Sequence, residues 1–181
     1  MLLWEDVTVS DLDRKPKSAL DLKFISHGTL ESKDLAKSRR FYEEFMGFDV
    51  VQASERAIWI RLGGNHVYVV IRATPATTAM PFANHNGIDV HSDAEVDRAH
   101  EIVQRDAEQW GLTKISNPRV QHGTYSFYFW DADENAWEIL SNPPGGYGWM
   151  FERGDQAGRG HWSKDFQRPD GVVPASDAGP K

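Results

Sequence analysis

Short runs of apolar and aromatic residues along the chain predict β-strands, and two longer amphipathic stretches predict helices. The first five predicted elements are a strand at about 22–30, a helix at about 34–46, and strands at about 48–53, 56–62 and 66–73. The next five are a strand at about 84–91, a helix at about 93–110, and strands near 113–118, 124–131 and 136–141. Ser32 or Asp34 can cap the first helix, and Gly47 suits its end. The order strand, helix, strand, strand, strand therefore occurs twice.

The repeated order predicts an internal duplication within one α+β domain, residues 21–142. His27 and His85 stand roughly 58 residues apart, which is longer than a solenoid repeat and suits two modules that face each other. The modules are expected at about 21–73 and 84–142, and the Pro- and Thr-rich stretch between them is a connector.

Two extensions flank this domain. Residues 1–20 are a polar N-terminal extension, and residues 143–181 are a C-terminal extension that begins with a Pro- and Gly-rich break. We expect the end of the second extension to be mobile, and aromatic residues to attach the rest of it to the domain. These aromatic residues are Trp149, Phe151, Trp162 and Phe166.

Composition limits the classes of function. The chain has 181 residues, a net charge of −7 and no Cys. A net negative chain lacks the clustered Lys and Arg of a nucleic-acid surface. The absence of Cys excludes disulfides and thiolate chemistry and fits a reducing, cytoplasmic setting. No apolar run reaches the ~18 residues that a membrane-spanning helix needs. We therefore expect a small-molecule partner, with no nucleic acid and no membrane.

The candidate chemistry centres on residues 120–142. Two aromatic strands flank an acidic turn, and alternation places Ala136, Glu138 and Leu140 on one face of the last strand. Glu138 is thus a carboxylate in an apolar strand, where burial is unfavourable unless a partner or metal is present. An exposed Glu, or one paired with Arg, is the plainer interpretation. His27 and His85 belong to two other strands, and two His with one carboxylate can form a three-ligand metal site with open positions.

These residues carry a resemblance to a known family. The stretches His27–Phe48, His85–Ala99 and Asp131–Glu138 resemble the vicinal oxygen chelate superfamily, which includes glyoxalase I, antibiotic-resistance proteins and type I extradiol catechol dioxygenases. The resemblance implies two βαβββ modules that pair into a cupped eight-stranded sheet around a metal site. Aligning the last strands of the modules sets Tyr68 against Glu138, so the first module is expected to lack a second ligand. The expected metal ligands are then His27, His85 and Glu138.

The pattern is closest to the extradiol dioxygenases. That resemblance implies Fe(II), with Mn(II) or Zn(II) as alternatives that the ligand types also allow. It also implies a role for Tyr128, in Ser126-Phe127-Tyr128, as a hydrogen-bond donor to the bound catecholate. His66 would be the acid–base residue and His122 a contact to the substrate hydroxyl. The plainer interpretations are an aromatic strand residue for Tyr128 and a turn residue for His66.

Three functions remain open at this point. The first is an iron-dependent oxidoreductase that uses O₂ to cleave the ring of a small aromatic diol, as in the degradation of aromatic compounds. The second is a glyoxalase-like lyase, isomerase or transferase that acts through a metal-held enediolate. The third is a metal-free resistance protein that only binds a small molecule. Members of the superfamily are mostly dimers or pair modules between chains, so a homodimer or higher homo-oligomer is expected.

Overall fold

The computed structural model describes residues 19–20, 22–73, 77–155 and 166–168. The predictions for residues 1–18, for Trp162 and for a mobile C-terminal end fall outside the described residues. The first module comprises β1 (His27–Ser32), α1 (Leu35–Arg40), the π-helical turn η2 (Phe41–Phe45), β2 (Asp49–Ser54), β3 (Ala57–Arg61) and β4 (Val67–Arg72). The second comprises η3 (Phe82–Asn84), β5 (Asn86–Val90), α2 (Asp93–Trp110), β6 (Arg119–Gln121), β7 (Thr124–Trp130) and β8 (Ala136–Ser141), and α3 (Gly148–Arg153) follows it.

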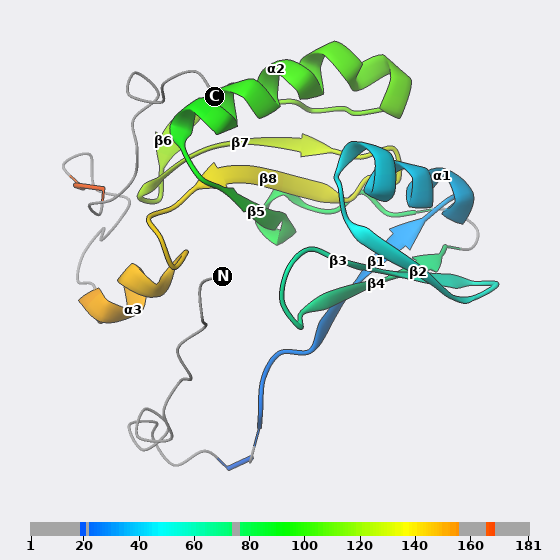
Figure 1. Ribbon diagram of the computed structural model, residues 1–181, viewed down its shortest axis with the longest axis horizontal. Coiled ribbons are helices and arrows are strands. Elements are labelled where there is room, and N and C mark those ends of the chain that lie inside the picture. The colour runs from blue at the N-terminus through cyan, green and yellow to red at the C-terminus, as the bar shows by residue number, and fades with distance from the viewer. Residues whose placement is uncertain (1–18, 21, 74–76, 156–165, 169–181) are drawn as a thin grey trace, which may run out of the picture.

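Each module forms one four-stranded sheet. The strand orders are β1-β4-β3-β2 and β5-β8-β7-β6, with the first strand of each module parallel to its last strand. The predicted α+β class and the duplication of a βαβββ module are therefore confirmed. Within the described part of one chain the two sheets are separate, and β1 and β5 each lie at a sheet edge (Figure 1).

Local sequence signals explain the helices. Asp34 caps α1 by accepting hydrogen bonds from the backbone N–H groups of Ala36 and Lys37, and the helix continues through η2. The Ser92 hydroxyl accepts a bond from the N–H of Glu95 at the start of α2, which ends at Gly111 in the left-handed conformation. No helix among the described residues is long and apolar enough to cross a lipid bilayer.

The strand predicted at 113–118 is wrong in its position. This segment does run beside β7, because Ser116 N–H donates to the carbonyl of Tyr128 at 2.9 Å, but regular pairing begins only at Arg119. Lys114 has a φ of 52°, outside the β region, and Pro118 has no N–H to donate. These two positions interrupt the strand, and they leave Thr113 and Trp130 as an isolated bridge.

Each sheet has one face covered by its helix and one face turned away from it. The helices α1 and α2 lie on the same side of the molecule in Figure 1. Side chains that alternate away from the helices form what we call the open faces. The open face of the first sheet includes His27, Thr29, Val67, Val69 and Ile71, and that of the second includes Gly87, Asp89, Tyr128, Glu138 and Leu140.

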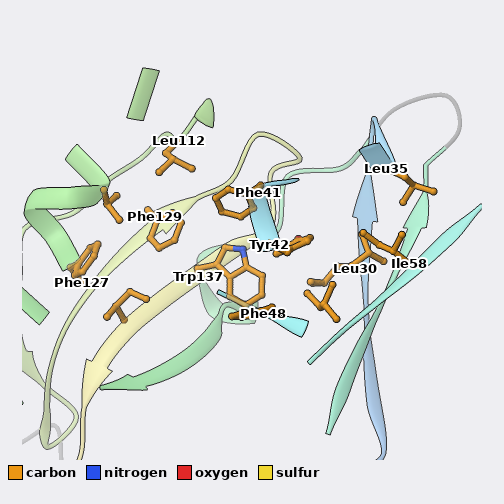
Figure 2. Close-up of a cluster of buried hydrophobic side chains, with 14 of the residues drawn as sticks. Leu30, Leu35, Phe41, Tyr42, Phe48, Ile58, Leu112, Phe127, Phe129 and Trp137 are labelled. Atoms are coloured by element: carbon orange, nitrogen blue, oxygen red, sulfur yellow. The ribbon is translucent and has the colours of Figure 1, made fainter. Parts of the chain in front are cut away.

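The core is formed on the helix side and continues from one module into the other. Trp137, 1% exposed, contacts Tyr42, Phe48 and Tyr68 of the first module with ring centroids 5.9 to 6.2 Å apart. Figure 2 shows this indole between Leu30 of the first sheet and the phenylalanines of β7. Trp137 therefore joins the two hydrophobic halves.

The turn between β7 and β8 adds a polar junction between the modules. The buried carboxylate of Asp131 accepts hydrogen bonds from Tyr42 Oη at 3.2 Å and from Trp137 Nε1 at 3.1 Å. Asp133 accepts from Lys33 N–H at 2.7 Å and from the hydroxyl of Ser38. Because these donors come mostly from the first module, the acidic turn fixes the start of β8 relative to both modules.

The C-terminal extension is attached by some of the predicted aromatic residues. Trp149 is buried, stacks near Phe166 with ring centroids 6.0 Å apart, and donates from Nε1 to Asn142 Oδ1 at 3.2 Å. Phe151 was predicted to help and does not, since its side chain is 86% exposed. It lies on the outer side of the short helix α3, where no part of the described chain covers it.

Candidate metal centre

Glu138 is the buried carboxylate at the centre of the second sheet. It lies on β8 opposite Gly87, is only 4% exposed, and shares its open face with Tyr128 on β7. Burial favours the neutral acid, but interactions with His85, Ser126 and Tyr128 outweigh it and lower the pKa of Glu138. The side chain is therefore an anion in a largely apolar setting, as the alternation in the sequence predicted.

His85 meets this carboxylate directly. Its Nε2 atom lies 3.1 Å from Glu138 Oε2, and its Nδ1 atom lies 2.7 Å from the carbonyl oxygen of Phe82. A carbonyl can only accept, so Nδ1 carries the hydrogen and, in neutral imidazole, Nε2 presents a bare lone pair. Two lone pairs facing each other at this distance need a positive charge between them. The hydrogen bond to the Glu138 carboxylate raises the pKa of His85, which favours a positive charge on the imidazole.

Tyr128 lies next to both groups. Its ring centroid is 4.9 Å from that of His85 and 4.6 Å from that of Phe82. The hydroxyl is buried without a hydrogen-bond partner of good geometry among the described residues, and so is Glu138 Oε1. Burial, and next the proximity of Glu138, raise the pKa of Tyr128, so the phenol stays protonated at neutral pH.

These observations fit a divalent cation at Glu138 and His85. A ligating His commonly donates its second ring N–H to a carbonyl, as Nδ1 of His85 does, and that bond directs Nε2 toward the metal. The uncompensated Oε1 of Glu138 and the unpartnered Tyr128 hydroxyl mark room for an ion and for a ligand oxygen. Imidazole and carboxylate suit Fe(II), Mn(II) or Zn(II).

His27 does not join this pair within the described part of one chain. There, no group of three His, Asp, Glu or Cys side chains converges closely enough to hold a metal. His27 is exposed at the start of β1, on the open face of the first sheet, and its Nδ1 lies 2.8 Å from the Ser26 hydroxyl. Two of the three predicted ligands are thus brought together, and the third lies on the other module.

His66, the predicted acid–base residue, directly precedes β4 in the first module. Its Nδ1 donates to the carbonyl of Ile25 at 3.2 Å, and its ring contacts Tyr68. It lines a cavity of about 500 Å³ between the modules, whose wall includes Trp137. Gly87 and Asp89 also line this cavity, so it reaches the edge strand β5 beside the carboxylate. The acid–base role of His66 stays a prediction.

His122 occupies the turn between β6 and β7 with a φ of 53°. The neighbouring Gly123 lies against the rings of Trp149 and Phe166, so the C-terminal extension packs on this turn. None of these contacts tests a role for the His122 ring. Its role as a substrate contact therefore also stays a prediction.

The structure corrects the expected alignment of Tyr68 with Glu138, because the two side chains lie on different faces of their sheets. Tyr68 pairs with Gly28 and packs on the helix side, where a β-carbon on Gly28 would lie 2.6 Å from its ring. The open face of β4 carries Val67, Val69 and Ile71 instead. None of these can bind a metal, so the conclusion that β4 contributes no ligand holds for a different reason.

Sequence reasoning missed the supporting groups around the pair. The Phe82 carbonyl fixes the His85 tautomer, and the Phe82 ring stands over Tyr128. Trp130 Nε1 donates to the carbonyl of Met80 at 2.9 Å, which holds the connector over the open face. Backbone carbonyls carry no sequence signal, so only the position of the Pro81-Phe82 turn before His85 could have suggested them.

Comparisons with known proteins identify the family of the chain. Residues 24–139 match the model of the "Glyoxalase/Bleomycin resistance protein/Dioxygenase superfamily". A catechol-2,3-dioxygenase of Bacillus subtilis (strain 168) is 26% identical over 138 residues, which are 75% of this chain and 43% of that protein. The chain therefore spans less than half the length of this curated relative.

Solved structures show the same fold. The fosfomycin resistance protein FosX from Mesorhizobium loti is 25% identical, with a TM-score of 0.52 over 68% of this chain and 95% of that one. A variant of FosX from Listeria monocytogenes, complexed with Mn(II) and 1S,2S-dihydroxypropylphosphonic acid, is 22% identical, with a TM-score of 0.52 over 65% and 89%. With a family model matched across both modules and a duplicated βαβββ fold, the chain belongs to the glyoxalase/bleomycin resistance protein/dioxygenase superfamily.

Proposed function

We propose that this protein is a metal-dependent oxidoreductase of the extradiol type, which cleaves the ring of a catechol-like substrate with O₂. The observation that carries the proposal is the buried Glu138–His85 pair with the unpartnered hydroxyl of Tyr128 beside it. The 26% identity to a catechol-2,3-dioxygenase supports the same reaction class. Fe(II) is the proposed metal, because it combines affinity for imidazole and carboxylate ligands with the ability to react with O₂.

His85 and Glu138 would hold the ion, which would supply a Lewis acid and redox chemistry with positions left for a diol and O₂. The protein's own groups serve the substrate. The Tyr128 hydroxyl donates to an anionic substrate oxygen, as its raised pKa keeps it protonated. The half-exposed ring of Phe82 gives an aromatic substrate an edge or face to pack against. Met80 and Trp130 exclude water from the adjoining surface.

We propose that His27 of a second copy completes the ligand set. Within the described residues β1 and β5 are both edge strands, and the open face of the first sheet exposes a row of apolar side chains. Val51, Trp59 and Val69 form this row across β2, β3 and β4, with His27 nearby on β1. A homodimer that sets this face against the second sheet of its partner would bury the row and bring an imidazole to the carboxylate.

Elemental analysis and turnover test the function together. Protein purified without O₂ should contain iron, or take up Fe(II), and after catechols and air are added it should consume O₂ and form a yellow ring-cleavage product. Glu138→Ala should abolish iron retention, because it removes the only carboxylate at the pair. Glu134→Ala is a matched control, since this acid lies in the same hairpin and its carboxylate pairs with Lys114. Iron-loaded protein that turns over no catechol in a broad panel contradicts the proposal.

A second candidate reaction keeps the metal and changes the chemistry. The similarity to FosX at 25% identity supports, as this second candidate, a glyoxalase-like lyase, isomerase or transferase that acts through a metal-held enediolate without O₂. Zn(II) or Mn(II) in the purified protein, with activity that survives strict exclusion of O₂, would select this candidate. A protein that binds an aromatic ligand with no metal, and keeps that affinity in Glu138→Ala, would select a binding function instead.

A further inference from the structure

A cavity of about 500 Å³ lies between the two modules, and its floor is made of core side chains. Phe48, Ile60 and Trp137 are buried and belong to the hydrophobic core, and the partly buried ring of Tyr68 lies with them in the lining. Figure 2 shows the indole of Trp137 next to Phe48, and their ring centroids are 5.9 Å apart. Because packing in the core fixes these rings, the floor is a preformed aromatic surface.

One wall of the cavity is the free edge of β5. Among the described strands β5 pairs only with β8, so the backbone groups on its other edge have no strand partner. Gly87 leaves this backbone uncovered, and Ile88 adds an apolar side chain to the lining. The wall therefore offers N–H and C=O groups next to an apolar surface, which suits a flat ligand with a polar substituent.

The two charged residues of the lining already have partners. Arg61 donates from Nε and Nη2 to Asp49 Oδ2 at 3.2 and 3.0 Å, and Asp89 accepts from the N–H of Asn142 at 2.9 Å. A charged ligand would have to compete with these interactions or enter an apolar cavity without a counter-ion, and burial of an unpaired charge is costly. The lining consequently favours an uncharged ligand.

His66 adds a hydrogen-bond acceptor at the exposed mouth of the cavity. Its Nδ1 lies 3.2 Å from the carbonyl oxygen of Ile25, which can only accept, so Nδ1 carries the hydrogen and Nε2 of the neutral ring presents a lone pair. Among the described residues only Ile25 is hydrogen-bonded to this ring. An edge-on contact with Tyr68, with ring centroids 5.2 Å apart, also holds the imidazole in place.

We propose that this cavity is a second ligand site, which binds a small uncharged phenol or naphthol. The ring of the ligand packs on the aromatic floor, and its hydroxyl donates to Nε2 of His66. The volume falls within the range of about 300–1,000 Å³ that is usual for small-molecule sites. The site needs neither a metal ion nor the reaction proposed at Glu138, and it gives His66 a task that is independent of both.

Calorimetric titration of the purified full chain with 2-naphthol and with 2-methoxynaphthalene tests this site. The probes share one ring system, and only 2-naphthol can donate a hydrogen bond, so wild type should bind it about fivefold more tightly than the ether. His66→Phe keeps a ring beside Tyr68 and removes the acceptor. Its Kd for 2-naphthol should rise about fivefold, and its Kd for the ether should stay the same. His91→Phe is the matched control, because His91 is exposed and does not line the cavity.

A second variant tests the position of the ring. Leu62 is an exposed apolar residue of the lining, so Leu62→Asp should weaken the binding of both probes without loss of thermal stability. Equal Kd values for 2-naphthol in His66→Phe and wild type overturn the proposal, and so does unchanged binding of both probes in Leu62→Asp. Binding that is lost in Glu138→Ala and kept in His66→Phe places the ligand at the metal pair instead. Affinity that falls as the protein concentration rises shows that a second copy fills the cavity, which also overturns the proposal.

Discussion

Glycine at position 87 determines how much room there is above the carboxylate of Glu138. It is the β5 partner of Glu138, and a β-carbon there would lie 3.2 Å from Leu140 Cδ2 and 4.0 Å from Glu138 Oε2. The backbone at Gly87 does not require glycine, because its φ is not positive. A side chain at position 87 would therefore matter because it fills space on the open face, and not because the backbone there requires glycine.

Gly87→Ala should weaken diol binding while leaving the fold intact. The added methyl group narrows the space over Glu138 and needs only a small shift of Leu140. We expect the Kd for 4-nitrocatechol to rise by about tenfold, with a change in unfolding free energy below about 1 kcal/mol. Gly64→Ala serves as the control, since nothing lies within 4 Å of its β-carbon position. Unchanged Kd in Gly87→Ala would place the ligand elsewhere.

At the residue scale, the sequence correctly predicted those features that follow from the alternation of side chains along a strand. Alternation along β8 placed Glu138 on the face opposite Trp137, as observed. It could not show that Nε2 of His85 faces the carboxylate, because that depends on a bond from Nδ1 to a backbone carbonyl. It also set Tyr68 against Glu138, whereas the Tyr68 ring packs against Gly28 on the helix side.

The turn between β7 and β8 is the element that combines stability and site geometry. Asp131 accepts bonds from Tyr42, Trp137 and the N–H groups of Asp133 and Asn135. Burial raises the pKa of Asp131 to about 6, although these hydrogen bonds oppose the shift. Acidic turns between strands are usually solvated, so the sequence predicted the turn correctly and did not predict its burial.

Asp131 should make the stability of the fold depend on pH between about 4 and 6. The pKa of Asp131 is higher in the folded chain than the ordinary value of 3.8, so the folded state binds more protons in this range. The unfolding free energy contributed by this group therefore falls as pH rises from about 4 to about 6, by about 2–3 kcal/mol, and is constant above. Denaturant unfolding of wild type and Asp131→Asn at several pH values measures it.

The variant should lack this component of the slope, because an amide does not titrate. Glu134→Gln at the same turn is a control, since Glu134 is partly exposed and pairs with Lys114. If wild type and Asp131→Asn show parallel curves between pH 4 and 6, then Asp131 is ionised throughout and its donors dominate over burial.

At the scale of the whole molecule, the described part of one chain brings together two of the three residues proposed as metal ligands. His85 and Glu138 meet on the second sheet, and His27 stays exposed on the first. The sequence predicted both modules and all three residues, yet no sequence signal says which modules face each other. That choice depends on surfaces such as the row of Val51, Trp59 and Val69, whose exposure appears only in three dimensions.

Mixed variants can show whether two chains share a site. Co-refolded His27→Ala and Glu138→Ala chains should recover about a quarter of the wild-type metal sites, because half of the dimers are mixed and each has one intact site. His85→Ala mixed with Glu138→Ala is the control and should recover none, since both changes affect the same half of the site. Metal content after gel filtration is the measurement. Recovery equal to the control would show that His27 is not shared between chains.

Trp137 and Glu138 are consecutive residues with unrelated tasks. The indole packs one module against the other, and the carboxylate, directed to the opposite face by the pleat, is the proposed metal ligand. A single peptide unit therefore couples the packing of the two modules to the position of the Glu138 carboxylate. Substitutions that change the packing between the two modules should therefore also move Glu138 and change the affinity for a metal ion.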